Sequence, residues 1–197
     1  MISVIKKIRS LGDAEDITDA INLKQMNSRI NFTEFNVLGN LTSNTSNPNV
    51  IISGSSNNST VYLVTDGNTS TVWSPTFSTT TNSNIIIQFL DCAHKITKFT
   101  IAGTTASAPD VPMNWFVAVG NNGTTWTTVY TSSNIIQSSS QTLIIDPSGY
   151  FKYYKFEFPP LSSGTSMYEI RTLQLFENRI VINDIINPTS EISPVPK

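Results

Sequence analysis

The 197-residue sequence has few of the residues that stapled scaffolds and nucleic-acid-binding proteins depend on. Cysteine occurs once, at Cys92, so no intrachain disulfide can form and a small disulfide-rich scaffold is excluded. Charged residues make up only 13% of the chain, about half the usual share of roughly 25%. The net charge is −2 and the basic residues are scattered, so we predict no nucleic-acid partner.

Long apolar runs are also missing. No run approaches the roughly 20 residues of a transmembrane helix, and we therefore predict no membrane insertion. The first eleven residues place Lys6, Lys7 and Arg9 after their apolar residues, which is the reverse of the order in a signal peptide. We expect a protein that is made in a cytoplasm and leaves it, if at all, by cell lysis or inside a particle.

Catalytic residues are scarce. His94 is the only histidine, and it lies in a predicted tight turn two residues after Cys92. A Cys-x-His pair could ligate a metal, but a closed zinc site needs four ligands and the sequence shows no second cluster, so an ordinary turn is the favoured interpretation. The two converging carboxylates of a glycosidase are not recognisable among the dispersed candidates Asp66, Asp91, Asp110, Asp146, Glu157 and Glu169. We predict that the protein is not an enzyme.

What is present divides into four segments. Residues 1–35 carry apolar side chains at helical spacing, and we predict a short α-helical N-terminal extension that docks on a partner, oligomerises or packs against its own domain. Residues 36–49 are rich in Asn, Ser and Thr and are predicted to be a polar linker. Residues 179–197, which hold three prolines near their end, are predicted to be an extended tail.

Residues 50–178 have the pattern of an all-β domain. Residues 85–90 and 96–101 are apolar and β-branched, as in buried strands. The segment that starts at Trp115 alternates apolar and polar side chains and ends at Asn121-Asn122-Gly123, a good hairpin turn. Short strands at this spacing predict a β-sandwich.

The most informative run is Asp66-Gly67-Asn68-Thr69-Ser70-Thr71-Val72-Trp73. Such a loop can wrap its own oxygens around a hard cation while Trp73 anchors it in a core. Alternatively, Asp66 caps the turn and Thr71 bonds to it. The run contains no nucleophile, base or phosphate cradle, and so it points to a binding module before an enzyme.

Roughly residues 50–178 resemble the coagulation-factor type C, or discoidin, domain family, which includes carbohydrate-binding modules attached to glycosidases. The elements that carry the resemblance are, in order, the run from Asp66 to Trp73, Ile87-Gln88-Phe89-Leu90, Ile96 with Phe99 and Ile101, the hairpin from Trp115 to Trp126, Lys152-Tyr153-Tyr154-Lys155-Phe156 and Leu173-Gln174-Leu175-Phe176.

The resemblance implies a discoidin-like jelly-roll β-sandwich of about eight strands, with a ligand site in loops at one end. It also implies a structural calcium beside the Asp-Gly loop, held by Asp66, Asn68 and Thr71. The family often adds a Glu on the last strand, and here Thr172 stands at that position. The sequence therefore offers this ion one clear carboxylate.

Glycan binding would need an exposed aromatic residue with polar neighbours. The loop aromatics Tyr62, Phe77 and Tyr168 are our candidates for a ligand-binding rim. The three tryptophans, Trp73, Trp115 and Trp126, match core positions of the family.

Three function classes remain open. The first is a non-enzymatic virion structural protein, of a bacteriophage capsid, tail or fibre, whose discoidin-like domain faces outward and touches host glycans for attachment. Its N-terminal helices would dock on other virion proteins or form a homo-oligomer. The alternatives are a carbohydrate-binding module that partners a glycosidase, and an exported adhesion protein, which would place the chain outside the cell or at the cell surface.

Overall fold

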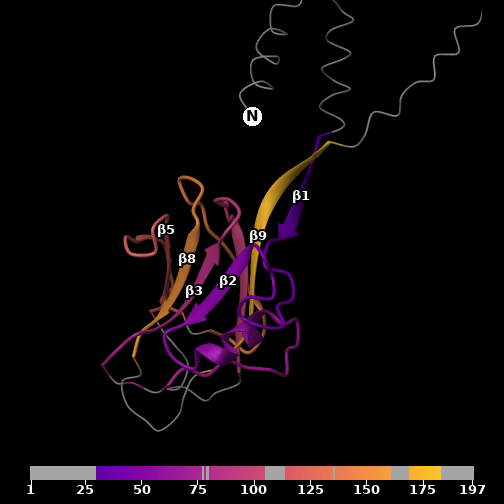
Figure 1. Cartoon of the computed structure of the whole chain (residues 1–197). Coiled ribbons are helices and arrows are strands. Elements are labelled where there is room, and N and C mark those ends of the chain that lie inside the picture. Colours follow the sequence, from indigo (N-terminus) through magenta and orange to yellow (C-terminus); the bar gives the residue numbers. More distant parts are fainter. Residues whose placement is uncertain are drawn as a thin grey trace, which may run out of the picture. The chain divides into compact units, whose positions relative to one another are not determined.

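The structure, a computed structural model, describes residues 30–76, 78, 80–104, 114–134, 136–160 and 169–182 (Figure 1). Within these residues the chain forms nine strands and one 3₁₀ helix. The strands are β1 (Ile30–Asn36), β2 (Val50–Gly54), β3 (Ser83–Phe89), β4 (Lys98–Gly103), β5 (Phe116–Gly120), β6 (Thr127–Thr131), β7 (Gln141–Ile144), β8 (Tyr153–Phe158) and β9 (Ile170–Ile182), and the helix is η1 (Asn58–Thr65).

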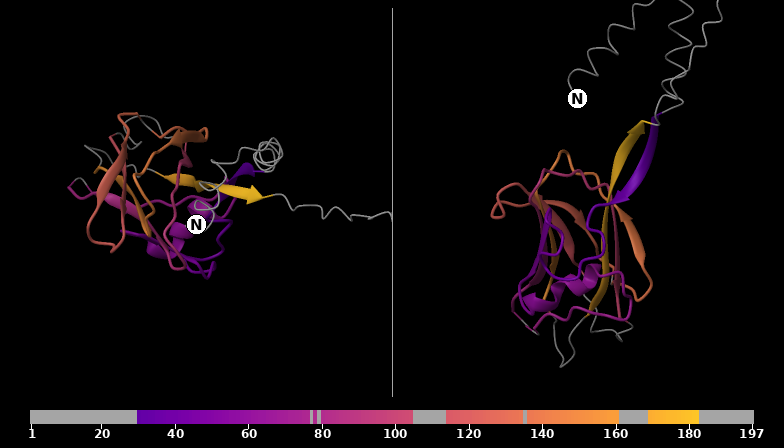
Figure 2. Two further views of the ribbon diagram at one scale, coloured as in Figure 1. Left: turned by 90° about the horizontal axis from the view of Figure 1, so that it is seen from above. Right: turned by 45° about the vertical axis from the view of Figure 1, so that its right-hand side comes forward.

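The strands form two sheets. One has four strands in the order β1-β9-β4-β7, and the other has five in the order β2-β3-β8-β5-β6. Figure 1 shows β2, β3, β8 and β5 of the larger sheet side by side, and Figure 2 gives two further views. Every strand pair with a determined register is antiparallel, and the two sheets confirm the predicted all-β sandwich.

Alternation along the strands explains which side chains form the core. In β3 and β8 every second residue is buried, because successive side chains in a strand point to opposite faces. Phe99 lies at the centre of the core, with edge-on contacts to Trp115, Tyr130 and Phe156 at ring distances of 5.2–5.9 Å. The buried cluster extends from Val37 to Leu175 and holds the two sheets together.

Two β-bulges interrupt the ladders. The register shifts between Val117 and Ala118 where β5 pairs with β6, and between Ala102 and Gly103 where β4 pairs with β9. A bulge inserts an extra residue into one strand and increases its local twist. The second bulge lies opposite the start of β9 and therefore changes the local twist and the side-chain directions at that end of the strand.

The segments predicted to flank the domain differ from expectation. Residues 30–35 were assigned to the helical extension, but they form strand β1, which pairs with β9. Residues 36–49 were expected to be a polar linker, yet they contribute Val37, Leu38 and Leu41 to the core. β9 continues to Ile182, into the predicted tail. The rest of the predicted helical segment, 1–29, and of the tail, 183–197, lies outside the described residues.

Contacts divide the chain into two compact units. Residues 34–178 form one, and the outer ends of β1 and β9 belong to the other. The site described below lies wholly within residues 34–178. Among the described residues, no helix has the length and apolar character to cross a membrane.

Candidate functional site

The loop after η1 is organised by Asp66 and Gly67. Asp66 ends the helix, and its Oδ1 accepts a hydrogen bond of 2.8 Å from the backbone N–H of Asn68. Gly67 has a φ of +79°, a conformation that glycine adopts without strain. A Cβ at this position would lie 2.5 Å from the Asn40 side-chain nitrogen. The sequence thus closes a tight turn that only glycine fits.

Thr71 gathers oxygen atoms inside this turn. Its Oγ1 lies 2.7 Å from Asp66 Oδ2, 2.8 Å from the Asn68 carbonyl oxygen and 3.5 Å from the Leu63 carbonyl oxygen. A hydroxyl has one proton to donate, and carboxylate and carbonyl oxygens only accept. The two short contacts therefore cannot both be hydrogen bonds donated by Thr71. The structure brings Asp66, Asn68 and Thr71 together, and its contacts are those of the alternative in which Asp66 caps the turn and Thr71 bonds to it; ion binding stays a prediction.

Trp73 fixes the end of the loop. Its side chain is fully buried, and its indole N–H donates to the Ser56 carbonyl oxygen at 3.1 Å. Its backbone pairs with Ile170 in both directions, with N···O distances of 2.8 and 3.0 Å. The loop is thereby joined to the start of β9, so its position follows from the sheet and not from local turn propensity alone.

A pocket of about 170 Å³ opens beside the loop. Its lining comes from η1, the Asp66 loop, the residue before β7, and β9: Val64, Thr65, Gly67, Asn68, Thr69, Ser140, Arg171, Thr172 and Gln174. Hydroxyl, amide and guanidinium groups dominate this lining. Arg171 Nε is buried and has no hydrogen-bond partner, and a buried donor without an acceptor costs about 1–3 kcal/mol. The side chain that carries this buried Nε also lines the pocket through other atoms of Arg171, so the pocket has a guanidinium group at its wall.

The donor set of the loop fits calcium in type. Asp66, the Asn68 carbonyl and Thr71 all offer oxygen, the element that calcium prefers. Calcium takes about 6–8 oxygen ligands, however, and Thr172, at the position where the family resemblance implies a Glu, adds no carboxylate. Water would have to complete the coordination, which indicates a weak site.

The predicted rim residues are only partly covered by the structure. Tyr62 lies on η1, half-buried, with its ring packed against the core. Phe77 and Tyr168 lie outside the described residues. The ligand-binding rim thus stays a prediction. No motif in the sequence indicates Arg171, Ser140 or Gln174 as pocket residues.

Two of the three tryptophans are core residues and one is not. Trp73 and Trp115 are buried, as predicted. The core prediction is wrong for Trp126, which is half-buried and outside the core cluster. Its ring packs edge-on against Tyr153 and lies 4.8 Å from Lys155 Nζ. Tyr153 and Lys155 lie on the face of β8 opposite to its buried residues, so Trp126 packs on the outer surface of the sheet.

The fold and the loop geometry can be compared with known proteins. The family model of the F5/8 type C domain matches residues 40–170. These residues include the Asp66 loop, η1 and strands β2 to β8. A sequence comparison with characterised proteins gives no match.

Three solved structures illustrate the similarity of fold. CpGH89CBM32-6 from Clostridium perfringens is 19% identical, with a TM-score of 0.53, and the match covers 68% of this chain and 97% of that one. The family 32 CBM of NanJ from C. perfringens, in complex with galactose, is 19% identical with a TM-score of 0.52, covering 65% and 93%. Chitosan-binding module 1 of a chitosanase/glucanase from Paenibacillus sp. IK-5 is 17% identical with a TM-score of 0.51, covering 66% and 96%.

Proposed function

Because the chain belongs to the F5/8 type C domain family, we propose that it is a non-catalytic carbohydrate-binding module. The observation that carries this proposal is the polar pocket beside the Asp66 loop. Sugar hydroxyls both donate and accept hydrogen bonds, and the pocket offers amide, hydroxyl and guanidinium groups to match them. The guanidinium group of Arg171, which lines the pocket, would donate to a sugar oxygen.

The lining also supports a non-catalytic role. Glycoside hydrolysis by the common mechanism needs two carboxyl groups on either side of the bond, and general acid–base catalysis needs a titratable group within hydrogen-bond reach. The described lining of the pocket contains no Asp, Glu or His. A bound sugar would be held there without a group to protonate its glycosidic oxygen.

The structural neighbours favour a module that partners a glycosidase over the virion setting. NanJ's module was solved with galactose, and the Paenibacillus module is chitosan-binding. We accordingly propose glycans as the partner and an extracellular or cell-surface location. No feature of the described residues supports a role in a capsid, tail or fibre. The virion role, bacteriophage origin and host attachment therefore stay predictions from composition.

A glycan array probed with the full chain tests the proposal. We expect selective binding, which calorimetry with galactose and chitosan oligosaccharides would then quantify. Arg171→Gln should weaken binding about 10-fold or more, since hydrogen bonds to charged groups contribute about 1.5–3 kcal/mol. Arg179→Gln is the matched control, because Arg179 lies on the same strand, is exposed and does not line the pocket.

Two results would contradict different parts of the proposal. An array on which no glycan binds would overturn the carbohydrate-binding function itself. Binding that Arg171→Gln leaves unchanged would keep the function and remove the pocket as its site. The loop aromatics Tyr62, Phe77 and Tyr168 would then become the next positions to substitute.

We further propose that the Asp66 loop holds a structural calcium ion through Asp66, the Asn68 carbonyl and Thr71. When bound, the ion would supply a positive charge that balances the Asp66 carboxylate and the carbonyl oxygen of Asn68. With one carboxylate, the expected Kd is about 0.1–1 mM, the range of weak extracellular sites.

Thermal unfolding in excess calcium and in chelator tests this ion. A ligand that binds only the folded chain raises stability, so the midpoint should rise with calcium in the wild type and not in Asp66→Asn. Asp146→Asn, which changes an exposed carboxylate elsewhere, should respond like the wild type. Equal midpoints in calcium and chelator for the wild type would show that Asp66 and Thr71 form a self-contained turn.

A further inference from the structure

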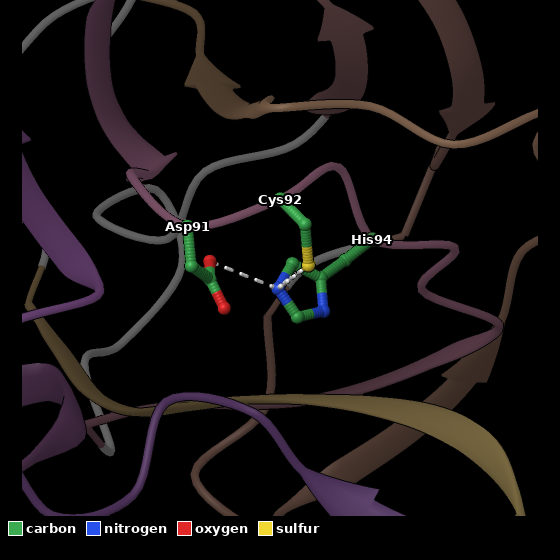
Figure 3. Close-up of side chains that lie close together, drawn as sticks. All are labelled: Asp91, Cys92 and His94. Carbon is green, nitrogen blue, oxygen red and sulfur yellow. Dashed lines mark hydrogen bonds and ion pairs between the residues drawn. The ribbon is translucent and has the colours of Figure 1, made fainter.

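A second cluster of ligand-type side chains lies in the turn between β3 and β4, separate from the sugar pocket. It joins Asp91, Cys92 and His94, whose ligand atoms all lie within 4.8 Å of one another. Figure 3 shows the Asp91 carboxylate and the Cys92 sulfur approaching the same ring nitrogen of His94. His94 Nε2 lies 3.4 Å from Asp91 Oδ1 and 3.6 Å from Cys92 Sγ.

The other nitrogen of the His94 ring faces a fourth side chain. His94 Nδ1 lies 2.9 Å from Glu177 Oε2, across 83 residues of sequence. Both groups are largely buried, with side-chain exposures of 8% and 13%. A carboxylate accepts a hydrogen bond from Nδ1–H and fixes the neutral ring so that Nε2 carries the lone pair. That lone pair then points at Asp91 and Cys92.

The backbone holds this arrangement in place. His94 pairs with Phe151 in an isolated bridge, with two N···O distances of 2.9 Å. The buried Tyr154 hydroxyl donates to the His94 carbonyl oxygen at 2.8 Å. The ring itself lies 4.2 Å from that of Phe89. The imidazole is therefore positioned by the sandwich before any ligand arrives.

The two separations that involve His94 match tetrahedral coordination. Zinc binds sulfur at about 2.3 Å and nitrogen or carboxylate oxygen at about 2.0–2.1 Å. At a tetrahedral angle these bond lengths separate sulfur from nitrogen by about 3.6 Å and nitrogen from oxygen by about 3.3 Å. From His94 Nε2 the distances are 3.6 Å to Cys92 Sγ and 3.4 Å to Asp91 Oδ1, and all three ligand atoms lie within 4.8 Å of one another, so the exposed Asp91 and Cys92 side chains would move closer together around a bound ion.

We propose that Asp91, Cys92 and His94 bind one zinc-type divalent cation, with Glu177 as the residue that positions His94. Thiolate and imidazole together favour zinc over calcium or magnesium. Three protein ligands leave the fourth position open, and it faces solvent because Asp91 and Cys92 are exposed. Water or a donor atom of a bound molecule would occupy that position.

A competing arrangement contains no metal. A protonated His94 would donate from both ring nitrogens, to the largely buried Glu177 and to the exposed Asp91, and form an ion triad. In that arrangement Cys92 has no required role. Coordination of the metal by the Cys92 thiolate therefore distinguishes the zinc site from the metal-free ion triad.

Cobalt(II) substitution supplies the direct readout. The untagged full chain, kept reduced with a non-chelating phosphine, is titrated with Co²⁺ and then with Zn²⁺. We expect one equivalent of Co²⁺ per chain, visible d–d bands with tetrahedral intensity and a thiolate-to-cobalt charge-transfer band. One equivalent of Zn²⁺ should remove all of these bands.

Substitutions of the exposed Asp91 and Cys92, and a near-isosteric change of the largely buried Glu177, assign the roles of the cluster. Cys92→Ala should abolish the charge-transfer band, and Asp91→Asn should weaken Zn²⁺ binding in calorimetry at least tenfold. Glu177→Gln should keep the thiolate band and weaken binding about 10- to 100-fold, as expected for a residue that orients a ligating histidine. Asp146→Asn, a nearby exposed carboxylate outside the cluster, should bind as the wild type does.

The absence of a thiolate band in the folded wild-type chain would overturn the proposal in favour of the ion triad. Zinc binding that Cys92→Ala leaves unchanged would do the same. These readouts use no sugar, so they stand or fall independently of the proposed carbohydrate site.

Discussion

Gly67 shows how one residue without a side chain can determine a loop. Its φ of +79° and its contact with Asn40 leave no room for a Cβ. We expect Gly67→Ala to lower the free energy of unfolding by about 1–2 kcal/mol or more, since a left-handed conformation costs about that much for other residues. Chemical denaturation measures this loss.

The same substitution at Gly149 is the control. A Cβ there meets nothing within 4 Å, and Gly149→Ala should change stability by less than about 1 kcal/mol or raise it slightly. Equal losses at both positions would mean that the turn at Asp66 imposes no special requirement on its second residue.

The Tyr154 hydroxyl serves two backbone groups in the interior. It accepts from the Ile96 N–H at 3.0 Å and donates to the His94 carbonyl oxygen at 2.8 Å. Tyr154→Phe leaves the Ile96 N–H without its acceptor, whereas the His94 carbonyl still accepts from the Phe151 N–H, so we expect the substitution to cost about 1–3 kcal/mol in urea denaturation.

Tyr154 also makes stability depend on alkaline pH. Burial raises its pKa well above the ordinary value of 10, and the charge of Glu177 adds to this effect. As pH rises past 10, the unfolded chain therefore loses this proton before the folded chain does. The free energy of unfolding should fall above pH 10 in the wild type, and part of that fall should vanish in Tyr154→Phe. Parallel pH profiles for the two proteins would contradict this role.

The carboxyl group of Asp91 has the opposite pKa shift. Burial by itself raises its pKa, but the hydrogen bond from the Cys92 backbone and the hydrogen bond and charge of His94 outweigh burial, so the pKa lies below its ordinary value. The carboxylate form is thereby the usual state of Asp91 in the turn.

Elements differ in how much their aromatic side chains contribute to stability. Trp115, next to β5, is buried against Tyr130 and Phe158, whereas Trp126, next to β6, is half-buried beside Lys155. We expect Trp115→Ala to cost about 3–5 kcal/mol and Trp126→Ala about 1 kcal/mol, the scale of an exposed cation–π contact. Thermal or urea unfolding of the two variants gives the comparison, and equal losses would mean that Trp126 belongs to the core after all.

Local pattern explains which elements the sequence predicts well. β3 and β4 agree with the strands predicted from the apolar, β-branched runs at 85–90 and 96–101, and both bury side chains in the core. β1 was missed because most of its side chains are exposed, Phe32 and Phe35 among them. Its strand conformation comes from pairing with β9, which no local pattern announces.

The residues of the two candidate sites can likewise be predicted only where they are close together in the sequence. Asp66, Asn68 and Thr71 are close in sequence, so their contact could be predicted. Arg171 reaches the Asp66 loop, and Glu177 reaches His94, only through the packing of β9. Asp91 could have been predicted as a third ligand beside the Cys-x-His pair, because it directly precedes Cys92 and is three residues from His94.

At the scale of the whole molecule, the core defines where the chain can be shortened. Every member of the core cluster lies between Val37 and Leu175. A chain that begins at Ile30 should unfold with a free energy within about 1 kcal/mol of the full chain. A chain that begins at Thr42 loses Val37, Leu38 and Leu41 and should be destabilised by about 5 kcal/mol or more, since each buried side chain contributes about 1.5–3 kcal/mol.

Light scattering on the full chain and on the chain that begins at Ile30 also tests the predicted association. If residues 1–29 carry the docking or oligomerisation role, the full chain should be a homo-oligomer and the chain from Ile30 a monomer. The same mass per particle for both would remove self-association through this segment.

The bulge between β5 and β6 has a consequence for behaviour at high concentration. In the described sheet β6 pairs only with β5 and is rich in threonine, and the register shift at Val117 and Ala118 twists it locally. Open strand edges are templates on which further chains can add, and short, polar, twisted edges discourage such growth. The edge strand β6 of the larger sheet is thus poorly suited to amyloid-like stacking. The nearby aromatic surface at Trp126 and Tyr153 can therefore be partly exposed without promoting aggregation through this edge.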